Sequence, residues 1–389
     1  MIKVGLLGAG RIGKVHARSI VADQRSQLLA VADINAQAAQ QLAATCGAKA
    51  RSAQEIIADP GIDAVLIATS TDTHAALIEA AVHAGKAVLC EKPVDLDLDR
   101  ALACQAVAAQ AGRPVMIGFN RRFDPHFAAL KRAFDAGDIG KGELLSITSF
   151  DPAPPPASYV KSSGGLFRDM AIHDLDMACW LFAALPVSVT ALGASIIDPA
   201  IGAEGDVDTA VITLGFADGR MAVIKNSRRA AYGYDQRVEL LGATGLLSVG
   251  NVLENTLTRI TSAGAHSAKP EYFFLERYMQ AYAAEWRAFI DAVTAGTDYP
   301  VTLQDGVNAL ALAQAATLSC HSGKTVQLDG GRPVSAARPP EGAHTAAEGE
   351  GIPASAARPP EGAHTAAEGE GLPMSAARPP AGEGAPASA

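Results

Sequence analysis

Residues 3–13 read KVGLLGAGRIG, an apolar run followed by three glycines in the spacing G-x-G-x-x-G. This pattern predicts a buried strand over Lys3–Leu7, a tight turn and the start of a helix. In such a turn Gly8 makes the bend, Gly10 lets a pyrophosphate approach the backbone, and Gly13 lets the helix pack against the strand. A glycine-rich turn without any ligand remains the alternative reading.

Further apolar runs follow this stretch and alternate with helical patterns. The predicted strands cover Leu28–Ala32, Ala64–Ala68, Ala87–Cys90 and Val115–Phe119. Strands that alternate with helices are typical of a parallel sheet covered on both faces by helices. The first 120 residues therefore indicate an α/β fold.

Polar residues stand where each of these predicted strands ends. They are the glycine turn, Asp33, Thr69–Thr71, Glu91–Pro93 and Asn120–Arg122. Ligands of an open parallel sheet bind at the carboxyl ends of its strands. We therefore expect these clusters to share one edge of the sheet and to form one binding site.

Asp33 follows Gly13 by twenty residues, at the end of the second predicted strand. A carboxylate there accepts hydrogen bonds from the adenosine ribose hydroxyls and repels a 2′-phosphate. The cofactor expected is thus NAD rather than NADP. The alternative is that Asp33 only caps the helix that follows.

Three residues carry the expected chemistry. Lys92 lies where the nicotinamide end of a dinucleotide would sit, and its ammonium group could stabilise negative charge on a reacting oxygen. Asp169 and His173 are four apart in a helical pattern, so the carboxylate could orient the imidazole for proton transfer. The alternatives are an exposed turn at Lys92 and a merely structural Asp–His pair. Asp174 and Asp176 are interpreted as solvated helix residues.

From about residue 143 to 260 the sequence pattern changes to that of strands in which apolar and polar residues alternate. The Asp218-Gly219 step predicts a hairpin, and one helix is expected over residues 169–182. Two later helices and a short strand complete a body that ends near Arg332. The strands expected in the antiparallel sheet cover 143–150, 186–197, 208–216, 219–227 and 237–242.

Tyr232 and Tyr234 alternate across Gly233, so in a strand both would point to the same side. Phenol groups hydrogen-bond hydroxyls and their rings stack on carbon skeletons, which fits a sugar-sized pocket. Plain packing within the sheet is the alternative.

Composition excludes several classes of protein. The net charge is −9 and the sequence has no basic stripe, so we do not expect a nucleic-acid-binding protein. No apolar run is long enough to span a membrane and the first residues do not resemble a signal peptide, so we expect a cytoplasmic protein. The five cysteines contain no CxxC pair, and the histidines show no metal-ligand spacing, so neither a disulfide framework nor a bound metal is expected.

Residues 333–389 repeat with a period of twenty and contain few apolar side chains that could form a core, which predicts a disordered tail.

Five ordered motifs together resemble the Gfo/Idh/MocA oxidoreductases and, within them, the inositol 2-dehydrogenases. They are GLLGAGRIGKVH at 5–16, CEKP at 90–93, GFNRRFDPHF at 118–127, SGGLFRDMAIHDLDM at 163–177 and NSRRAAYGYDQR at 226–237. The resemblance covers roughly residues 2–330. It implies an N-terminal Rossmann domain (1–122), a C-terminal α/β domain with a large open, mainly antiparallel sheet (123–332), and a homotetramer.

The resemblance also implies a reaction and a set of site residues. The reaction is NAD-dependent oxidation of myo-inositol to 2-keto-myo-inositol, with another cyclic polyol such as scyllo-inositol or glucose as the alternative substrate. A non-catalytic regulator that senses the dinucleotide is the rival from another class. The catalytic set falls on Lys92, Asp169 and His173. Expected substrate contacts are Asn120, Arg121, Asp151, Tyr232 and Tyr234. Expected cofactor contacts are Gly8, Gly10, Arg11, Ile12, Gly13, Asp33, Thr69, Thr71, His74, Glu91 and Lys92.

Overall fold

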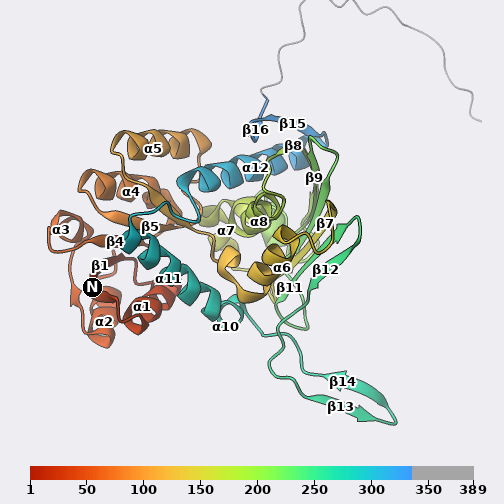
Figure 1. Ribbon diagram of the computed structural model, residues 1–389, viewed down its shortest axis with the longest axis horizontal. Coiled ribbons are helices and arrows are strands. Elements are labelled where there is room, and N and C mark those ends of the chain that lie inside the picture. Colours follow the sequence, from red (N-terminus) through yellow and green to blue (C-terminus); the bar gives the residue numbers. More distant parts are fainter. Residues whose placement is uncertain (335–389) are drawn as a thin grey trace, which may run out of the picture. The chain divides into compact units, whose positions relative to one another are not determined.

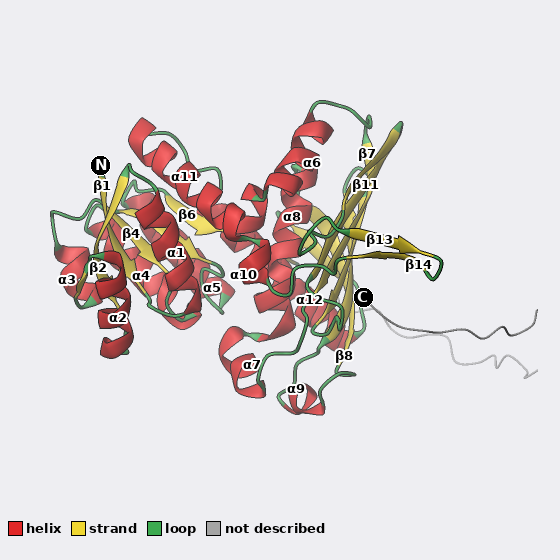
Figure 2. Cartoon of the chain, turned by 90° about the horizontal axis from the view of Figure 1, so that it is seen from below, coloured by secondary structure: helices red, strands yellow, loops and turns green. Residues whose placement is uncertain are grey.

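The computed structural model describes residues 1–334, which form two β-sheets packed against helices (Figures 1 and 2). The predicted disordered tail, apart from its first two residues, lies outside the described residues. Within residues 1–334, no helix is both long and apolar enough to cross a bilayer.

The first sheet has six strands in the order β3-β2-β1-β4-β5-β6, and every neighbouring pair is parallel. The predicted strands agree with β1, β2, β4, β5 and β6 to within two residues at each end. The short β3 and the helix α3 were not predicted. The elements are β1 (Ile2–Leu7), α1 (Arg11–Ala22), β2 (Ser26–Ala32), α2 (Ala36–Cys46), β3 (Lys49–Ala50), α3 (Ala53–Ala58), β4 (Ala64–Ile67), η1 (Thr71–Thr73), α4 (His74–His83), β5 (Ala87–Glu91), α5 (Leu98–Gln110) and β6 (Val115–Gly118).

The core of this sheet is closed by helices from the far end of the sequence. All four residues of β4 are buried, as expected of a strand covered on both faces. Trp286, Phe289 and Val307 pack into the same hydrophobic cluster. They come from α11 (Met279–Ala295) and α12 (Leu303–Ser322). The division at residue 122 therefore stays a prediction, because later residues share this core.

The second sheet has eight strands in the order β12-β11-β7-β10-β9-β8-β15-β16. Only β7 and β10 pair in parallel, so the prediction of a mainly antiparallel sheet is confirmed. The predicted hairpin joins β9 to β10, and Gly219 in its turn has a φ of 87°. The strands are β7 (Gly142–Phe150), β8 (Pro186–Ala194), β9 (Thr209–Phe216), β10 (Met221–Ser227), β11 (Asp235–Gly242), β12 (Gly245–Val249), β15 (Val326–Asp329) and β16 (Arg332–Pro333).

This sheet is covered on one face. Along β9 every second residue is buried, as in a sheet with one face on the core. Figure 2 shows the helices on that side and a projecting hairpin on the other. The remaining elements are η2 (Asn120–Phe123), α6 (Pro125–Asp135), α7 (Ala157–Ser163), α9 (Pro199–Ala203), β13 (Thr258–Thr261), β14 (Gly264–Ser267) and α10 (Phe274–Arg277).

The helix predicted over residues 169–182 is divided in two. A π-helical segment, η3 (Phe167–Ala171), leads directly into α8 (Ile172–Phe182). Asp169 lies in the π-helical segment and His173 in the first turn of α8. Single-turn π-helical insertions are often found at functional sites.

Candidate active site

One cavity of about 930 Å³ lies at the carboxyl ends of the parallel strands and extends to the helix-covered side of the second sheet. Most of the predicted site residues line it. They are Gly10, Arg11, Ile12, Asp33, Thr69, Thr71, His74, Glu91, Lys92, Asn120, Arg121, Asp151, Asp169, His173 and Tyr234. Gly8, Gly13 and Tyr232 are not among the lining residues.

The three glycines of the first turn have different surroundings. A Cβ atom at Gly8 would lie 2.2 Å from the Ala68 carbonyl oxygen, and one at Gly13 would lie 2.0 Å from the Gly8 carbonyl oxygen. A Cβ at Gly10 would meet no atom of residues 1–334 within 4 Å. Gly8 and Gly13 are thus required by packing, whereas Gly10 borders open space at the start of α1, where uncapped amide groups can bind a phosphate.

Asp33 is held at the end of β2 by two backbone groups. Its Oδ2 accepts from the amide of Ala9 at 2.6 Å and its Oδ1 from that of Asn35 at 2.7 Å. Asn35, not Asp33, caps α2 by accepting from the amides of Gln37 and Ala38. The capping alternative for Asp33 is therefore wrong. Its carboxylate borders the cavity beside the glycine turn, as a dinucleotide site requires.

His74 joins two of the loops that border the cavity. Its Nδ1 lies 2.8 Å from the Pro93 carbonyl oxygen and its Nε2 lies 3.2 Å from that of Thr69. Burial lowers the pKa of His74. The Thr69 hydroxyl pairs with that of Thr73 at 2.7 Å. His74 thus fixes the loops after β4 and β5 relative to each other.

Lys92 and Asp169 meet across the two halves of the fold. The Lys92 ammonium group donates to the backbone oxygen of Asp169 at 2.8 Å and lies 3.5 Å from its Oδ1. The Asp169 carboxylate also accepts from Arg228 at 2.9 Å and from the Tyr159 hydroxyl at 3.1 Å. Burial opposes ionisation of Asp169, but the charges of Lys92 and Arg228 and these hydrogen bonds hold its pKa below the ordinary value.

His173 is close to these groups but is not bonded to Asp169. No hydrogen bond between the two is found in the described part of the chain, and the His173 Nδ1 is buried without a partner there. The expectation that Asp169 directly orients His173 is wrong, because the carboxylate accepts from Arg228 and Tyr159 and pairs with Lys92 instead. Burial, together with the positive charges of Lys92 and Arg121, places the pKa of His173 well below its ordinary value. The imidazole is therefore neutral at pH 7 and can accept a proton.

Arg121 and Arg122 pair with two aspartates of α8. Arg121 donates to Asp174, and Arg122 donates to Asp176 at 2.8 Å. Both aspartates are at most 2% exposed, so the expectation of solvated helix residues is wrong. Removing two charges from water is costly unless they are paired, and each arginine supplies that pairing. Arg121 borders the cavity while anchored in this way.

The two tyrosines do not share a face. They lie in a turn before β11, where Gly233 has a φ of 130°, so the alternation of a strand does not apply. Tyr234 is buried, lines the cavity and packs edge-on against Tyr278. Tyr232 is 49% exposed and donates to Asp235 outside the cavity. The expected substrate contact of Tyr232 does not fit this placement.

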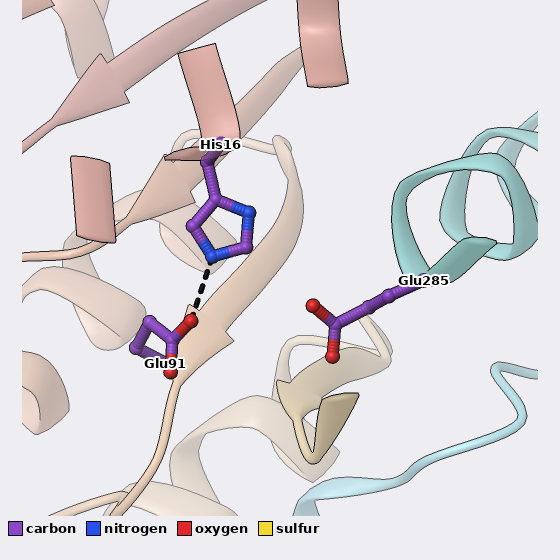
Figure 3. Close-up of side chains that lie close together, drawn as sticks. All are labelled: His16, Glu91 and Glu285. Atoms are coloured by element: carbon purple, nitrogen blue, oxygen red, sulfur yellow. Dashed lines mark hydrogen bonds and ion pairs between the residues drawn. The ribbon is translucent and has the colours of Figure 1, made fainter. Parts of the chain in front are cut away.

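Glu91 borders the cavity, and its carboxylate also lies in a buried cluster with His16 and Glu285 (Figure 3). The His16 Nε2 lies 2.7 Å from Glu91 Oε1, and potential metal-ligating atoms of all three residues lie within 4.8 Å of one another. Both carboxylate oxygens of Glu285 are buried without a partner among the described residues. Burial and the nearby Glu91 charge hold the pKa of Glu285 well above its ordinary value, so the folded protein keeps this proton to a higher pH than the unfolded chain does. That no metal is bound stays a prediction.

This protonated acid makes stability depend on pH. Above about pH 5 the unfolded chain loses the Glu285 proton while the folded protein keeps it, so this group lowers the free energy of unfolding by up to ~1.4 kcal/mol per pH unit. Glu285→Gln should remove this dependence and gain stability relative to the wild type as the pH rises above about 5. Denaturant unfolding at several pH values measures the difference, with the exposed Glu276→Gln as a control. A constant difference across this range would contradict the assignment.

Arg228 and Tyr159 also belong to the site, although the sequence analysis did not single them out. Arg228 stands in the NSRRAAYGYDQR motif, and its position directly after a strand whose alternate residues are buried was the available signal. Tyr159 follows a proline-rich segment, PAPPP at 152–156, which borders the cavity. No pattern in the sequence connects either residue with Asp169.

Comparison with known proteins identifies the family. Residues 2–119 match the family model described as "Oxidoreductase family, NAD-binding Rossmann fold", and residues 127–248 match the GFO/IDH/MocA C-terminal domain. An inositol 2-dehydrogenase from Rhizobium meliloti is 47% identical over 327 residues, which cover 84% of this chain and 99% of that protein.

Two solved structures show the same fold. A myo-inositol dehydrogenase from Corynebacterium glutamicum superposes with a TM-score of 0.82 at 42% identity, over 85% of this chain and 99% of that one. A scyllo-inositol dehydrogenase from Lactobacillus casei, solved with NAD(H) and scyllo-inositol, gives 0.79 at 32% identity, over 84% and 99%. With both halves matched in order, the chain belongs to the Gfo/Idh/MocA family of NAD-binding oxidoreductases.

Proposed function

We propose that this protein oxidises a ring hydroxyl of myo-inositol to a ketone, giving 2-keto-myo-inositol, with NAD⁺ as the oxidant. The observation that carries the proposal is that Lys92, Asp169 and His173 line the same cavity as the glycine turn and Asp33. The relatives named above are inositol dehydrogenases, which supports an inositol as the substrate.

The site residues supply the proton chemistry. NAD⁺, when bound, accepts the hydride that leaves the alcohol carbon. The neutral imidazole of His173 accepts the hydroxyl proton, and the Lys92 ammonium group stabilises negative charge on the oxygen. Asp169 holds that ammonium group in place through its backbone oxygen and its carboxylate.

Cofactor contacts are proposed for the glycine turn, Asp33 and the loops after β4 and β5. Gly10, Arg11 and Ile12 border the phosphate side, where α1 begins. Asn120, Arg121, Asp151 and Tyr234 are proposed to contact the polyol, since all four line the remaining cavity.

Asp33→Ala should relax the preference for NAD over NADP. The carboxylate repels a 2′-phosphate and accepts from ribose hydroxyls, so its loss weakens NAD binding and removes the repulsion. The ratio of kcat/KM for the two cofactors measures this effect. An unchanged ratio would remove Asp33 from the cofactor site.

Turnover on a panel of polyols tests the proposed function. NADH formation is followed with myo-inositol, scyllo-inositol and glucose, each with NAD⁺ and NADP⁺. The proposal expects the highest kcat/KM for myo-inositol with NAD⁺. A preference for scyllo-inositol or glucose would favour the alternative substrate, and NAD⁺ binding without turnover on any polyol would favour a regulator.

The open face of the second sheet supports the proposal of a homo-oligomer, a tetramer by family resemblance. Leu246, Leu241, Leu144 and Met221 are direct cross-strand neighbours in one row on that face. Three of them are between 43% and 56% exposed. A row of exposed apolar side chains is typical of an interface. Light scattering of the purified protein measures the assembly.

A cytoplasmic location is also proposed. All five cysteines lie among the described residues and are free thiols, which suits a reducing compartment.

A further inference from the structure

Arg228 connects two carboxylates that come from different parts of the chain. One nitrogen of its guanidinium group donates to Asp151 at 3.0 Å and another donates to Asp169 at 2.9 Å. Arg228 is 5% exposed, and all three side chains line the cavity. Asp151 follows β7, Asp169 lies in η3 and Arg228 follows β10.

Arg228 supplies one of the positive charges that face Asp151 and Asp169. Lys92 and Arg228 face Asp169 and Asp151, with the Tyr159 hydroxyl as the remaining donor to Asp169. Burial raises the pKa of Asp151 even with Arg228 beside it. Without the guanidinium group, Lys92 would be the remaining ion-pair partner of Asp169, and Arg121, itself paired with Asp174, would be the remaining positive charge near Asp151, so the pKa values of both carboxylates would rise.

The backbone of this region does not depend on the Arg228 side chain. The Arg228 amide donates to the Asp208 carbonyl at 2.8 Å, and the Asp151 amide donates to the Ser227 carbonyl at 2.9 Å. The Ala230 amide donates to the Asp151 carbonyl at 2.6 Å. These bonds join backbone atoms only, so we expect them to form in Arg228→Gln and Arg228→Lys as well.

We propose that Arg228 is a positioning residue that holds Asp151 and Asp169 ionised and in register, so that Asp151 accepts from a polyol hydroxyl while Asp169 fixes Lys92. This inference rests on the proposed function and adds a residue to it. The planar fork of arginine can donate to two carboxylates at fixed angles, which an ammonium group on a flexible stem does less well. A lysine at this position therefore restores the charge but only part of the geometry.

The experiment compares Arg228→Gln, Arg228→Lys and Arg229→Ala. Arg229 is the exposed neighbour and gives a matched control. Arg228→Gln is expected to lower kcat/KM for myo-inositol by about 10²-fold. The acid limb of its pH profile should move upward by about one unit or more, because an opposite charge near Asp169 is lost. Arg228→Lys should restore most of the pH profile but only part of the rate, and Arg229→Ala should match the wild type.

A second measurement does not need turnover. Infrared difference spectra against Asp169→Asn isolate the carboxylate band of Asp169, and its titration gives the pKa directly. The band should titrate at higher pH in Arg228→Gln than in the wild type. NADH fluorescence titration and thermal unfolding confirm that each variant is folded and binds cofactor.

The outcomes separate the inference from the proposed function. A wild type that is inactive on every polyol would sink the proposed function while the infrared titration still tests Arg228. If the wild type is active but Arg228→Gln shows the same acid limb and the same Asp169 titration as the wild type, the inference about Arg228 is wrong. The proposed function would then still stand. Equal losses in the Lys and Gln variants, without a pH shift, would mean that Arg228 is only structural.

Discussion

Replacing His173 with alanine is expected to lower turnover on myo-inositol by about 10²–10⁴-fold, the range that general-base assistance contributes. The pKa of His173 lies well below its ordinary value because the ring is buried near Lys92 and Arg121. The imidazole is therefore in its proton-accepting form throughout the neutral range. Steady-state kinetics at pH 7 measures the loss, and NADH fluorescence titration should show nearly unchanged cofactor binding, since the glycine turn is intact.

Two controls separate proton transfer from packing. His83→Ala removes an exposed histidine of α4 and should leave turnover unchanged. Added imidazole should restore part of the activity of His173→Ala, because a small base can enter the space that the ring leaves. Turnover close to that of the wild type, or a full loss without rescue and with a lowered melting temperature, would count against the general-base role.

The first sheet was predictable because its strands are buried on both faces. Runs such as Ala64–Ala68 are apolar at every position, and this run lies between the polar residues Asp63 and Thr69. The strand β3 was missed because it has only two residues, Lys49 and Ala50, both exposed. Two residues carry no periodicity, so such a strand is defined only by its pairing with β2.

Placing the site residues at one edge of the sheet was also possible from the sequence, but their partners were not. Asp174 and Asp176 have the pattern of solvated helix residues, yet both are buried and paired with arginines. These arginines, Arg121 and Arg122, stand more than fifty positions earlier in the chain. Asp169 lies four residues from His173, but its carboxylate is turned toward Arg228. Spacing along a helix tells which side chains are neighbours there, and it contains no information about donors from another strand.

The cluster of His16, Glu91 and Glu285 was also not predictable, because its members come from distant parts of the chain. Glu91 and Lys92 are adjacent in sequence and were grouped as one polar turn at the sheet edge. In the fold both residues border the cavity, but the Lys92 ammonium group pairs with Asp169, while the Glu91 carboxylate lies 2.7 Å from the His16 Nε2 and close to Glu285 (Figure 3). Successive residues at the end of a strand point to opposite sides, so a run of polar residues can serve two environments.

Replacing Lys92 with methionine should lower kcat by about 10²–10³-fold, as expected when one donor to a developing oxyanion is removed. Methionine keeps the length and apolar stem of the side chain, so the loss reports the ammonium group. The variant should also change its pH profile. The Lys92 charge lowers the pKa values of both His173 and Asp169, so without it both rise. The pH below which activity falls must then move upward.

The two readouts of Lys92→Met together distinguish chemistry from binding. If the ammonium group only bound the polyol, KM would rise while kcat and the acid limb stayed in place. If it stabilises the reacting oxygen, kcat falls and the acid limb shifts, and saturating substrate restores neither. Lys141→Met, at an exposed position before β7, should behave as the wild type. An unchanged kcat in Lys92→Met would remove this lysine from the reaction, since no other ammonium group among residues 1–334 lines the cavity.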